Sequence, residues 1–144
     1  MKPGQFWPIL LSDGRFACGR VLQIARHYGE ISTKTFLAGL MDWAGDVEPT
    51  SSDLSGSQIL ASGSAHIKTI TSSGACITGF RDLAADDLTV PLSLSHAVGP
   101  NCHLVRGYNI LGLASEEHRR RLQPFSTWGY NFINLLAEKH FATV

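Results

Sequence analysis

The sequence predicts an α+β fold: a mainly antiparallel, strongly curled sheet or small barrel of about five to six strands, with C-terminal helices packed on it. Alternating apolar residues and turn signals recur through residues 4–113, which is typical of antiparallel hairpins. The apolar periodicity becomes helical over residues 115–141. A length of 144 residues fits a single domain, 1–144, made of this β-rich part and a helical tail.

The first two strands are predicted at residues 5–11 and 15–26, joined by a turn at Asp13-Gly14. Asp-Gly between apolar runs is a strong hairpin signal, because a type I′ turn requires a positive φ at both central residues. Arg20 shares the inward parity of the apolar residues on the second strand. Either Gly19 forms a bulge that shifts the register, which we favour, or Arg20 enters the core and needs a carboxylate or carbonyl partner.

The middle of the chain alternates between short strands and polar loops. Further strands are expected at residues 30–40, 65–71, 75–80, 90–94 and 102–113. Between them the composition predicts an acidic, solvated loop at 42–53, a short helix within 54–62, a second acidic loop at 82–87, and turns at 72–74 and 99–101.

Two helices are predicted in the tail. Ser115 caps the first, which runs to residue 121 with acids in its first turn and bases in its last. Thr127 is expected to cap the second, which continues to Phe141. Its polar arc is narrow, so most of this helix should be covered by the sheet, with part of it available to a partner as the alternative.

Composition and charge exclude several classes of protein. The 12 basic and 12 acidic residues leave no net charge, which disfavours nucleic-acid binding. No apolar run is long enough to cross a membrane, and the N-terminus lacks the apolar run of a signal peptide. Three cysteines without a C-x-x-C spacing predict a reduced, cytoplasmic protein. The oligomeric state stays open.

No catalytic motif stands out in the sequence. There is no G-x-S-x-G elbow and no glycine-rich phosphate loop. The best candidate ligands for a metal are His96, Cys102 and His103, with His66 and Cys76 on a predicted hairpin. Zinc needs three or four such side chains converging on one point, so we predict no metal site, no cofactor and no catalytic residue.

The remaining features favour a binding protein over an enzyme. Aromatic anchors inside a charged rim are the usual anatomy of a tight protein interface. The candidate contact residues are aromatic or acidic: Trp7, Trp43, Asp42, Asp46, Glu48, Asp82, Asp86 and Asp87.

Three segments carry a resemblance to a known family. Residues 3–22 contain a Gly-x-Phe strand, an Asp-Gly turn and an aromatic-x-x-Gly-Arg-Val strand. Residues 77–83 (ITGFRDL) and 104–108 (LVRGY) follow later in the chain. These segments resemble the immunity protein 26 family of bacteria, most sharply in the opening hairpin, whereas residues 42–64 and the C-terminal helices match no motif of that family.

The resemblance implies a protein that binds and blocks a cognate bacterial toxin. Acidic loops would suit a basic toxin. The family label is shared with a small phosphotriesterase, so the alternative is a phosphoric triester hydrolase. That enzyme would use a divalent metal at His66, His96, Cys102 and His103. A small ligand-binding or regulatory β-barrel module is a third possibility.

The Asp13-Gly14 turn makes a direct prediction. Replacing Gly14 with valine places a β-branched residue at a positive φ, which should lower the free energy of unfolding by about 1–2 kcal/mol. Thermal denaturation of the variant beside the wild-type protein measures this change. An unchanged melting temperature would contradict the predicted hairpin.

Overall fold

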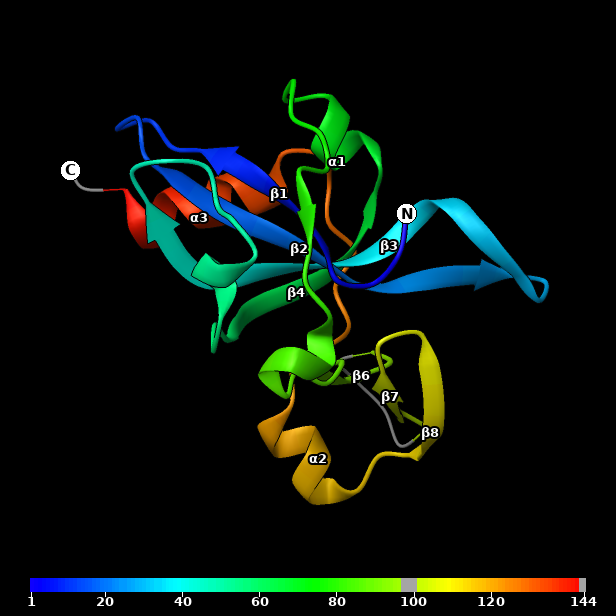
Figure 1. Cartoon of the computed structure of the whole chain (residues 1–144). Helices are drawn as coiled ribbons and strands as arrows, with labels where there is room; N and C mark the ends of the chain where they lie inside the picture. The colour runs from blue at the N-terminus through cyan, green and yellow to red at the C-terminus, as the bar shows by residue number, and fades with distance from the viewer. Residues whose placement is uncertain (97–100, 143–144) are drawn as a thin grey trace.

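Two antiparallel sheets make up the framework of the structure, a computed structural model that describes residues 1–96 and 101–142. The larger sheet has the strand order β4-β3-β2-β1-β5 and the smaller one β6-β7-β8 (Figure 1). The strands are β1 (Gln5–Leu10), β2 (Phe16–His27), β3 (Glu30–Gly45), β4 (Ile59–His66), β5 (Gly79–Phe80), β6 (Leu92–Leu94), β7 (His103–Arg106) and β8 (Asn109–Leu113).

Helical segments connect and cover the sheets. They are the short 3-10 turns η1 (Ser52–Leu54) and η2 (Leu83–Asp86) and the helices α1 (Lys68–Thr71), α2 (Glu116–Arg121) and α3 (Phe132–Phe141). The α+β class with mainly antiparallel sheets and a C-terminal helix is therefore confirmed. The larger sheet is open, because β4 and β5 lie at its opposite ends, and a closed barrel is not present in the described residues. None of the helices in residues 1–96 and 101–142 has the length and apolar character needed to cross a membrane.

The opening hairpin forms as predicted, but its turn is of another type. The N–H of Gly14 donates to the carbonyl of Leu11 (3.0 Å), and the N–H of Leu11 donates to Arg15 (2.8 Å). Residues 12–14 therefore form a three-residue loop between Leu11 and Arg15. Within this loop only Gly14 has a positive φ, +89°, so the loop is not a two-residue type I′ turn. The requirement for glycine at position 14 is the same in both geometries.

Gly19 does not form the bulge that we favoured, because the ladder of β1 with β2 is regular from Phe6 and Arg20 to Leu10 and Phe16. A Cβ on Gly19 would lie 2.3 Å from the ring of Trp7, so this glycine makes room for the indole. The irregularity lies in β3 instead: Ala17 pairs with Ala44, while Gly19 pairs with Leu40. The side chain of Arg20 therefore stays on the inward face of β2.

The segment after β3 differs from the prediction. Strand β3 continues through the expected acidic loop as far as Gly45, since the N–H of Asp42 donates to the carbonyl of Gln58 (2.8 Å). The helix expected within 54–62 is wrong, because Gly56 takes a φ of +73° and the chain continues into β4.

Later strands are also shorter than predicted. The expected strand at 65–71 ends at His66 and gives way to α1, whose Ile70 is buried, and only Gly79–Phe80 of the strand at 75–80 is formed. Gly107, with a φ of +58°, folds the predicted long strand 102–113 into the hairpin β7–β8. Residues 99 and 100 of the predicted turn lie outside the described residues.

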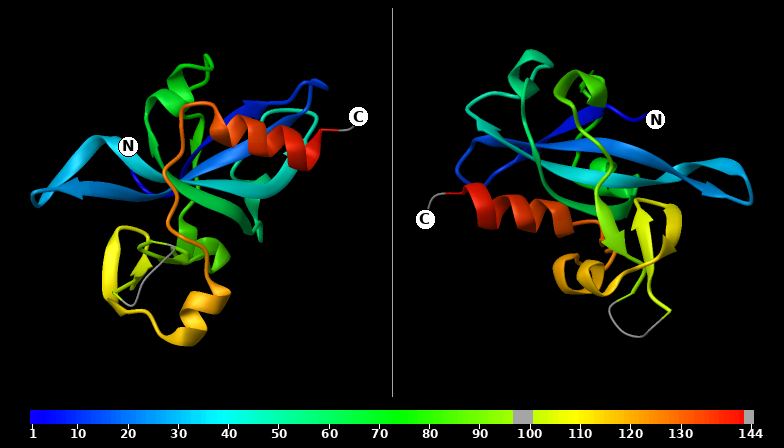
Figure 2. Two further views of the ribbon diagram at one scale, coloured as in Figure 1. Left: turned by 180° about the vertical axis from the view of Figure 1, so that it is seen from behind. Right: turned by 90° about the horizontal axis from the view of Figure 1, so that it is seen from below.

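The final helix begins later than predicted, because Thr127 is part of an extended segment. The Ser64 N–H donates to the carbonyl of Ser126, and the Ser64 carbonyl accepts from the N–H of Trp128, both at 2.8 Å. The first helix of the tail agrees with the prediction, since the Ser115 hydroxyl accepts from the His118 N–H (3.1 Å). Helix α3 packs against β1, β2 and β3, as expected for a helix on the sheet (Figure 2). It is less covered than predicted, since only Ile133 and Ala137 are buried and the apolar side chains of Phe132 and Leu135 are exposed.

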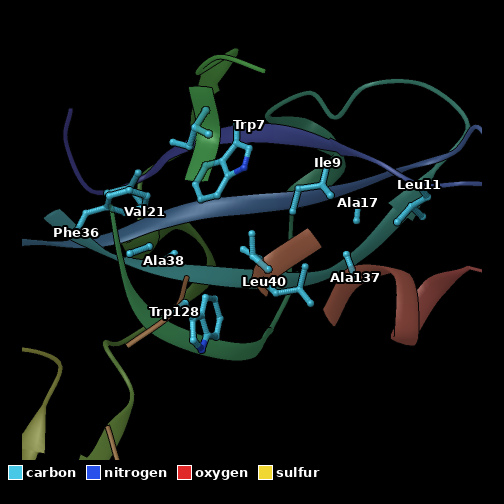
Figure 3. Packing of buried hydrophobic residues seen from close by; sticks show 13 residues of the cluster. Trp7, Ile9, Leu11, Ala17, Val21, Phe36, Ala38, Leu40, Trp128 and Ala137 are labelled. Carbon is cyan, nitrogen blue, oxygen red and sulfur yellow. The ribbon is translucent and has the colours of Figure 1, made fainter. Parts of the chain in front are cut away.

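The larger sheet is covered on both faces. One face carries the main core, in which the Trp7 and Phe36 rings meet edge to face (centroids 5.8 Å apart), and Trp128 and α3 cover it (Figure 3). The other face carries a smaller cluster of Phe6, Cys18, Met41 and Leu54, covered by irregular segments. The smaller sheet has its own cluster around Leu94, Cys102 and Ala114.

The three thiols should react at very different rates. Burial raises the pKa of Cys18 to about 12, so the reactive thiolate is scarce at pH 8. Cys76 is exposed, whereas Cys102 is buried. We expect a thiol reagent to label Cys76 rapidly and Cys18 only after unfolding, as measured by mass spectrometry of the labelled peptides. Cys76→Ser should abolish the fast phase, and rapid labelling of Cys18 in the folded protein would contradict the prediction.

Candidate interaction surface

The side chain of Arg20 is completely buried on the second face of the larger sheet. Its Nη1 and Nη2 atoms both donate to Oδ2 of Asp86 (3.2 Å each), and Nη2 also donates to the carbonyls of Arg81 (2.7 Å) and Asp82 (3.3 Å). Of the two alternatives for Arg20, a bulge at Gly19 or entry into the core with carboxylate and carbonyl partners, the structure therefore contains the second. A buried cation requires such compensation, because removing it from water without a partner costs several kcal/mol.

Asp86 collects hydrogen bonds from three parts of the chain. Besides Arg20, the guanidinium of Arg81 donates to both of its oxygens (2.8–3.0 Å), and the backbone N–H of Gly56 donates to Oδ1 (3.0 Å). These hydrogen bonds, those of Arg81 foremost, hold the pKa of Asp86 well below its usual value. The Asp86 side chain is buried in this network, so it is not on the surface where we had placed it as a contact residue.

The two tryptophan candidates also differ from expectation. Trp7 is buried in the main core, at 1% exposure, and cannot serve as an exposed anchor. Strand β1 is covered on both faces of the sheet, since Trp7 packs in the main core and Phe6 in the smaller cluster. The alternation of residues in the sequence does not show that both faces are covered. Trp43 is half-buried against the smaller cluster that contains Met41 and Leu54.

The remaining acidic candidates are on the surface. Asp42 lies on β3, and Asp46 and Glu48 follow the end of that strand. Asp82 is exposed but its carboxylate accepts from the Ala84 N–H (3.0 Å), which caps η2. Asp87 ends η2 at a φ of +53° and is exposed.

The four residues proposed for the metal alternative do not come together. His66 ends β4 and its ring lies 5.5 Å from that of Tyr130. His96, Cys102 and His103 lie around the β6–β7 connection, where the buried Cys102 thiol donates to the His96 carbonyl (3.0 Å). Within residues 1–96 and 101–142, no group of three or more His, Cys, Asp or Glu side chains is placed to hold a metal ion. The residues present therefore do not fit the divalent metal that this alternative requires.

A surface that the sequence interpretation missed lies on β8. All five residues of this edge strand are exposed, including Ile110 at 69%, Leu111 at 53% and Leu113 at 67%. Strand β8 pairs with β7 alone and has a bulge at Leu111, and its three large apolar side chains are at least half exposed. Edge strands of natural proteins usually carry charges or proline that prevent pairing with other chains, and Asn109–Leu113 contains neither. In the sequence, this surface could have been found from the uncharged segment that contains Ile110, Leu111 and Leu113.

The outer edges of β4 and β6 are covered by the chain itself. Residues 123–128 run along β6 and β4 (Figure 1), where Leu94 exchanges backbone hydrogen bonds with this segment (2.9 and 2.7 Å) and Ser64 does the same (2.8 Å). Glycine at position 63 lets Trp128 approach, since a Cβ there would lie 2.3 Å from the indole. The outer edge of β8 has no such cover among the described residues.

Tyr108 positions β8 relative to the larger sheet. Its hydroxyl and that of Ser64 in β4 are 2.6 Å apart, and its backbone N–H donates to Oε1 of Gln23 in β2 (2.9 Å). Burial raises the pKa of Tyr108, so its hydroxyl keeps its proton. Because β8 begins at the next residue, this contact fixes where the exposed strand starts.

Basic residues follow β8 at its end. Helix α2 begins two residues after Ala114, whose carbonyl accepts from Nη1 of Arg119 (3.0 Å). Arg120 pairs with Glu116 (2.7 Å) on the exposed face of this helix, and Arg121 is exposed. Glu116 and Glu117 occupy the first turn of the same helix, so the segment after the apolar strand carries charges of both signs.

Comparisons with protein families, characterised proteins and solved structures found no match to this chain.

The Arg20–Asp86 network should make stability depend on pH. Because the pKa of Asp86 is lower in the folded than in the unfolded chain, its contribution to the free energy of unfolding is present above about pH 4 and is lost as the pH falls. We expect Asp86→Asn to cost about 3 kcal/mol at pH 7 and to flatten the loss of stability between about pH 5 and 2. Urea denaturation at several pH values measures both effects.

Asp87→Asn is the matched control for this experiment. Asp87 is exposed, and its backbone takes a left-handed conformation that asparagine also accepts. The free energy of unfolding of the Asp87→Asn variant should therefore differ from that of the wild-type protein by less than about 0.5 kcal/mol. An Asp86→Asn protein with the wild-type pH profile would show that the carboxylate does not act as described.

Proposed function

We propose that this protein is an immunity protein that neutralises a cognate bacterial toxin by binding to its surface. The observation that carries the proposal is the uncovered apolar edge strand β8, with Ile110, Leu111 and Leu113 exposed. Exposed apolar clusters of this kind mark sites of protein interaction more often than chance exposure does.

An extended segment of the toxin is the occupant that fits this edge. The free side of β8 offers backbone N–H and C=O groups, which an added strand satisfies, while alternate apolar side chains supply contact area. The absence of charge and proline in Asn109–Leu113 leaves nothing on the strand to oppose such pairing.

The opening hairpin supports the immunity function through its resemblance to the immunity protein 26 family. The resemblance is carried by residues 3–22, 77–83 and 104–108, which form β1, the first part of β2, β5, the start of η2, and most of β7 with its turn into β8. The last of these segments contains Tyr108, which positions β8. The resembling segments thus include the part of the chain that supports the proposed contact.

The acidic residues have a different role in the proposal. Asp42, Asp46 and Glu48 are exposed and belong to the larger sheet or follow it, whereas β8 belongs to the smaller sheet. They attract a basic toxin over long range and raise the rate of encounter, so their effect should weaken as salt is added.

Co-expression with the toxin encoded beside this gene tests the function. The wild-type protein should restore growth of the bacterial host and co-purify with the toxin. A double substitution, Ile110→Lys with Leu111→Lys, should lower the affinity for the toxin by about tenfold or more, because two charges oppose the added strand. Calorimetric titration with the purified toxin measures the dissociation constants.

Leu135→Lys serves as the control, because Leu135 is a large apolar residue of similar exposure, 59%, on α3. It should bind the toxin as the wild-type protein does. No rescue and no complex with the wild-type protein would overturn the function, whereas full affinity of the β8 variant would overturn the proposed surface.

A further inference from the structure

The hairpin of β2 and β3 ends in an arm that extends from the larger sheet on the side away from α3 (Figure 2). Its last ladder pairs are Arg26 with Ile31 and His27 with Glu30. Two residues, Tyr28 and Gly29, form the tip. Residues 26–31 are all exposed, so no other described part of the chain covers the arm.

Tyr28 is unusual in both conformation and exposure. Its φ is +52° and that of Gly29 is +82°, so the tip is a turn in which both central residues are left-handed. Asparagine, aspartate and glycine are the residues that favour such a turn, whereas a bulky aromatic residue is strained there. The side chain is completely exposed, at 107%, and its ring has no aromatic, cationic or hydrogen-bonding partner among the described residues.

The ring is neither buried nor bonded within the described part of the chain. Residues held in such strained conformations cluster at binding and active sites. Tyrosine is among the residues that most often dominate the binding energy of protein interfaces, because it brings a large rigid ring and a polar hydroxyl.

The arm adjoins the proposed toxin-binding strand. A cavity of about 380 Å³ lies at its base, lined by Arg26 and Ile31 from the arm and by Tyr108 and Asn109 from the β7–β8 hairpin. The start of β8 therefore lies near the base of the arm. Arg26 has no carboxylate partner within the described chain, and its guanidinium bonds only weakly to the Gly29 carbonyl (3.4 Å).

We infer that the arm inserts Tyr28 into a concave, apolar cleft of the toxin that occupies β8, with an acidic group of the toxin meeting Arg26. This inference rests on the proposed function and extends it. A convex hairpin fits a concave site, and clefts with apolar walls and a few polar groups are where enzymes bind their substrates. Insertion of the arm would block such a site by occupying it.

Tyr28→Asn tests the inference, because it separates folding from binding. Asparagine suits a left-handed position, so the melting temperature should stay the same or rise. The affinity for the toxin encoded beside this gene should fall by about tenfold or more, since the anchoring ring is lost. Tyr28→Phe keeps the ring and should stay within about threefold of the wild-type affinity.

The control is Thr33→Asn, an exposed residue of the arm away from its tip, whose affinity should match that of the wild-type protein. Absence of toxin binding by the wild-type protein would overturn the proposed function and this inference together. Wild-type binding with an unchanged affinity of Tyr28→Asn would overturn the inference alone. A lower melting temperature of Tyr28→Asn that accounts for the loss of binding would also overturn it, because Tyr28 would then serve folding.

Discussion

The buried guanidinium of Arg20 is the constraint on which much of this fold depends. A cation in the middle of a sheet must be surrounded by oxygen acceptors, and β2 alone supplies none. Asp86 and the carbonyls of Arg81 and Asp82 meet this need, and Asp86 in turn binds the backbone at Gly56. One charge thereby holds two irregular segments of the chain over the second face of the larger sheet, where Leu54 and Leu88 pack.

The way in which the chain covers its own sheets explains where it can meet a partner. The segment 123–128 binds along β6 and β4, and α3 covers one face of the larger sheet. The apolar edge of β8 and the arm at the end of β2 and β3 lack this protection among the described residues. Asn109, the first residue of β8, lines one cavity with Arg26 and Ile31 of the arm, so the start of β8 lies near the base of the arm.

The sequence predicted the exposure of only some of the candidate contact residues correctly. It took Trp7 and Asp86 for surface groups, and both are buried: Trp7 lies in the main core that Trp128 and α3 cover, and Asp86 lies in the network with Arg20 on the second face of the sheet. It also placed Ile110 within one long strand, whereas the positive φ of Gly107 turns the chain and leaves β8 at an edge. Asp42, Asp46 and Glu48 are exposed as expected, since charged side chains seldom leave water without a partner.

The sequence by itself determined the opening hairpin, the antiparallel character of the sheets and the Ser115 helix cap, because alternation, turn residues and capping act between residues close in the chain. Only the tertiary structure decided the partner of Arg20, which lies 66 positions away, and the edge that remains free. Those outcomes depend on which distant segments pack together, and neither the periodicity nor the composition of a single strand contains that information.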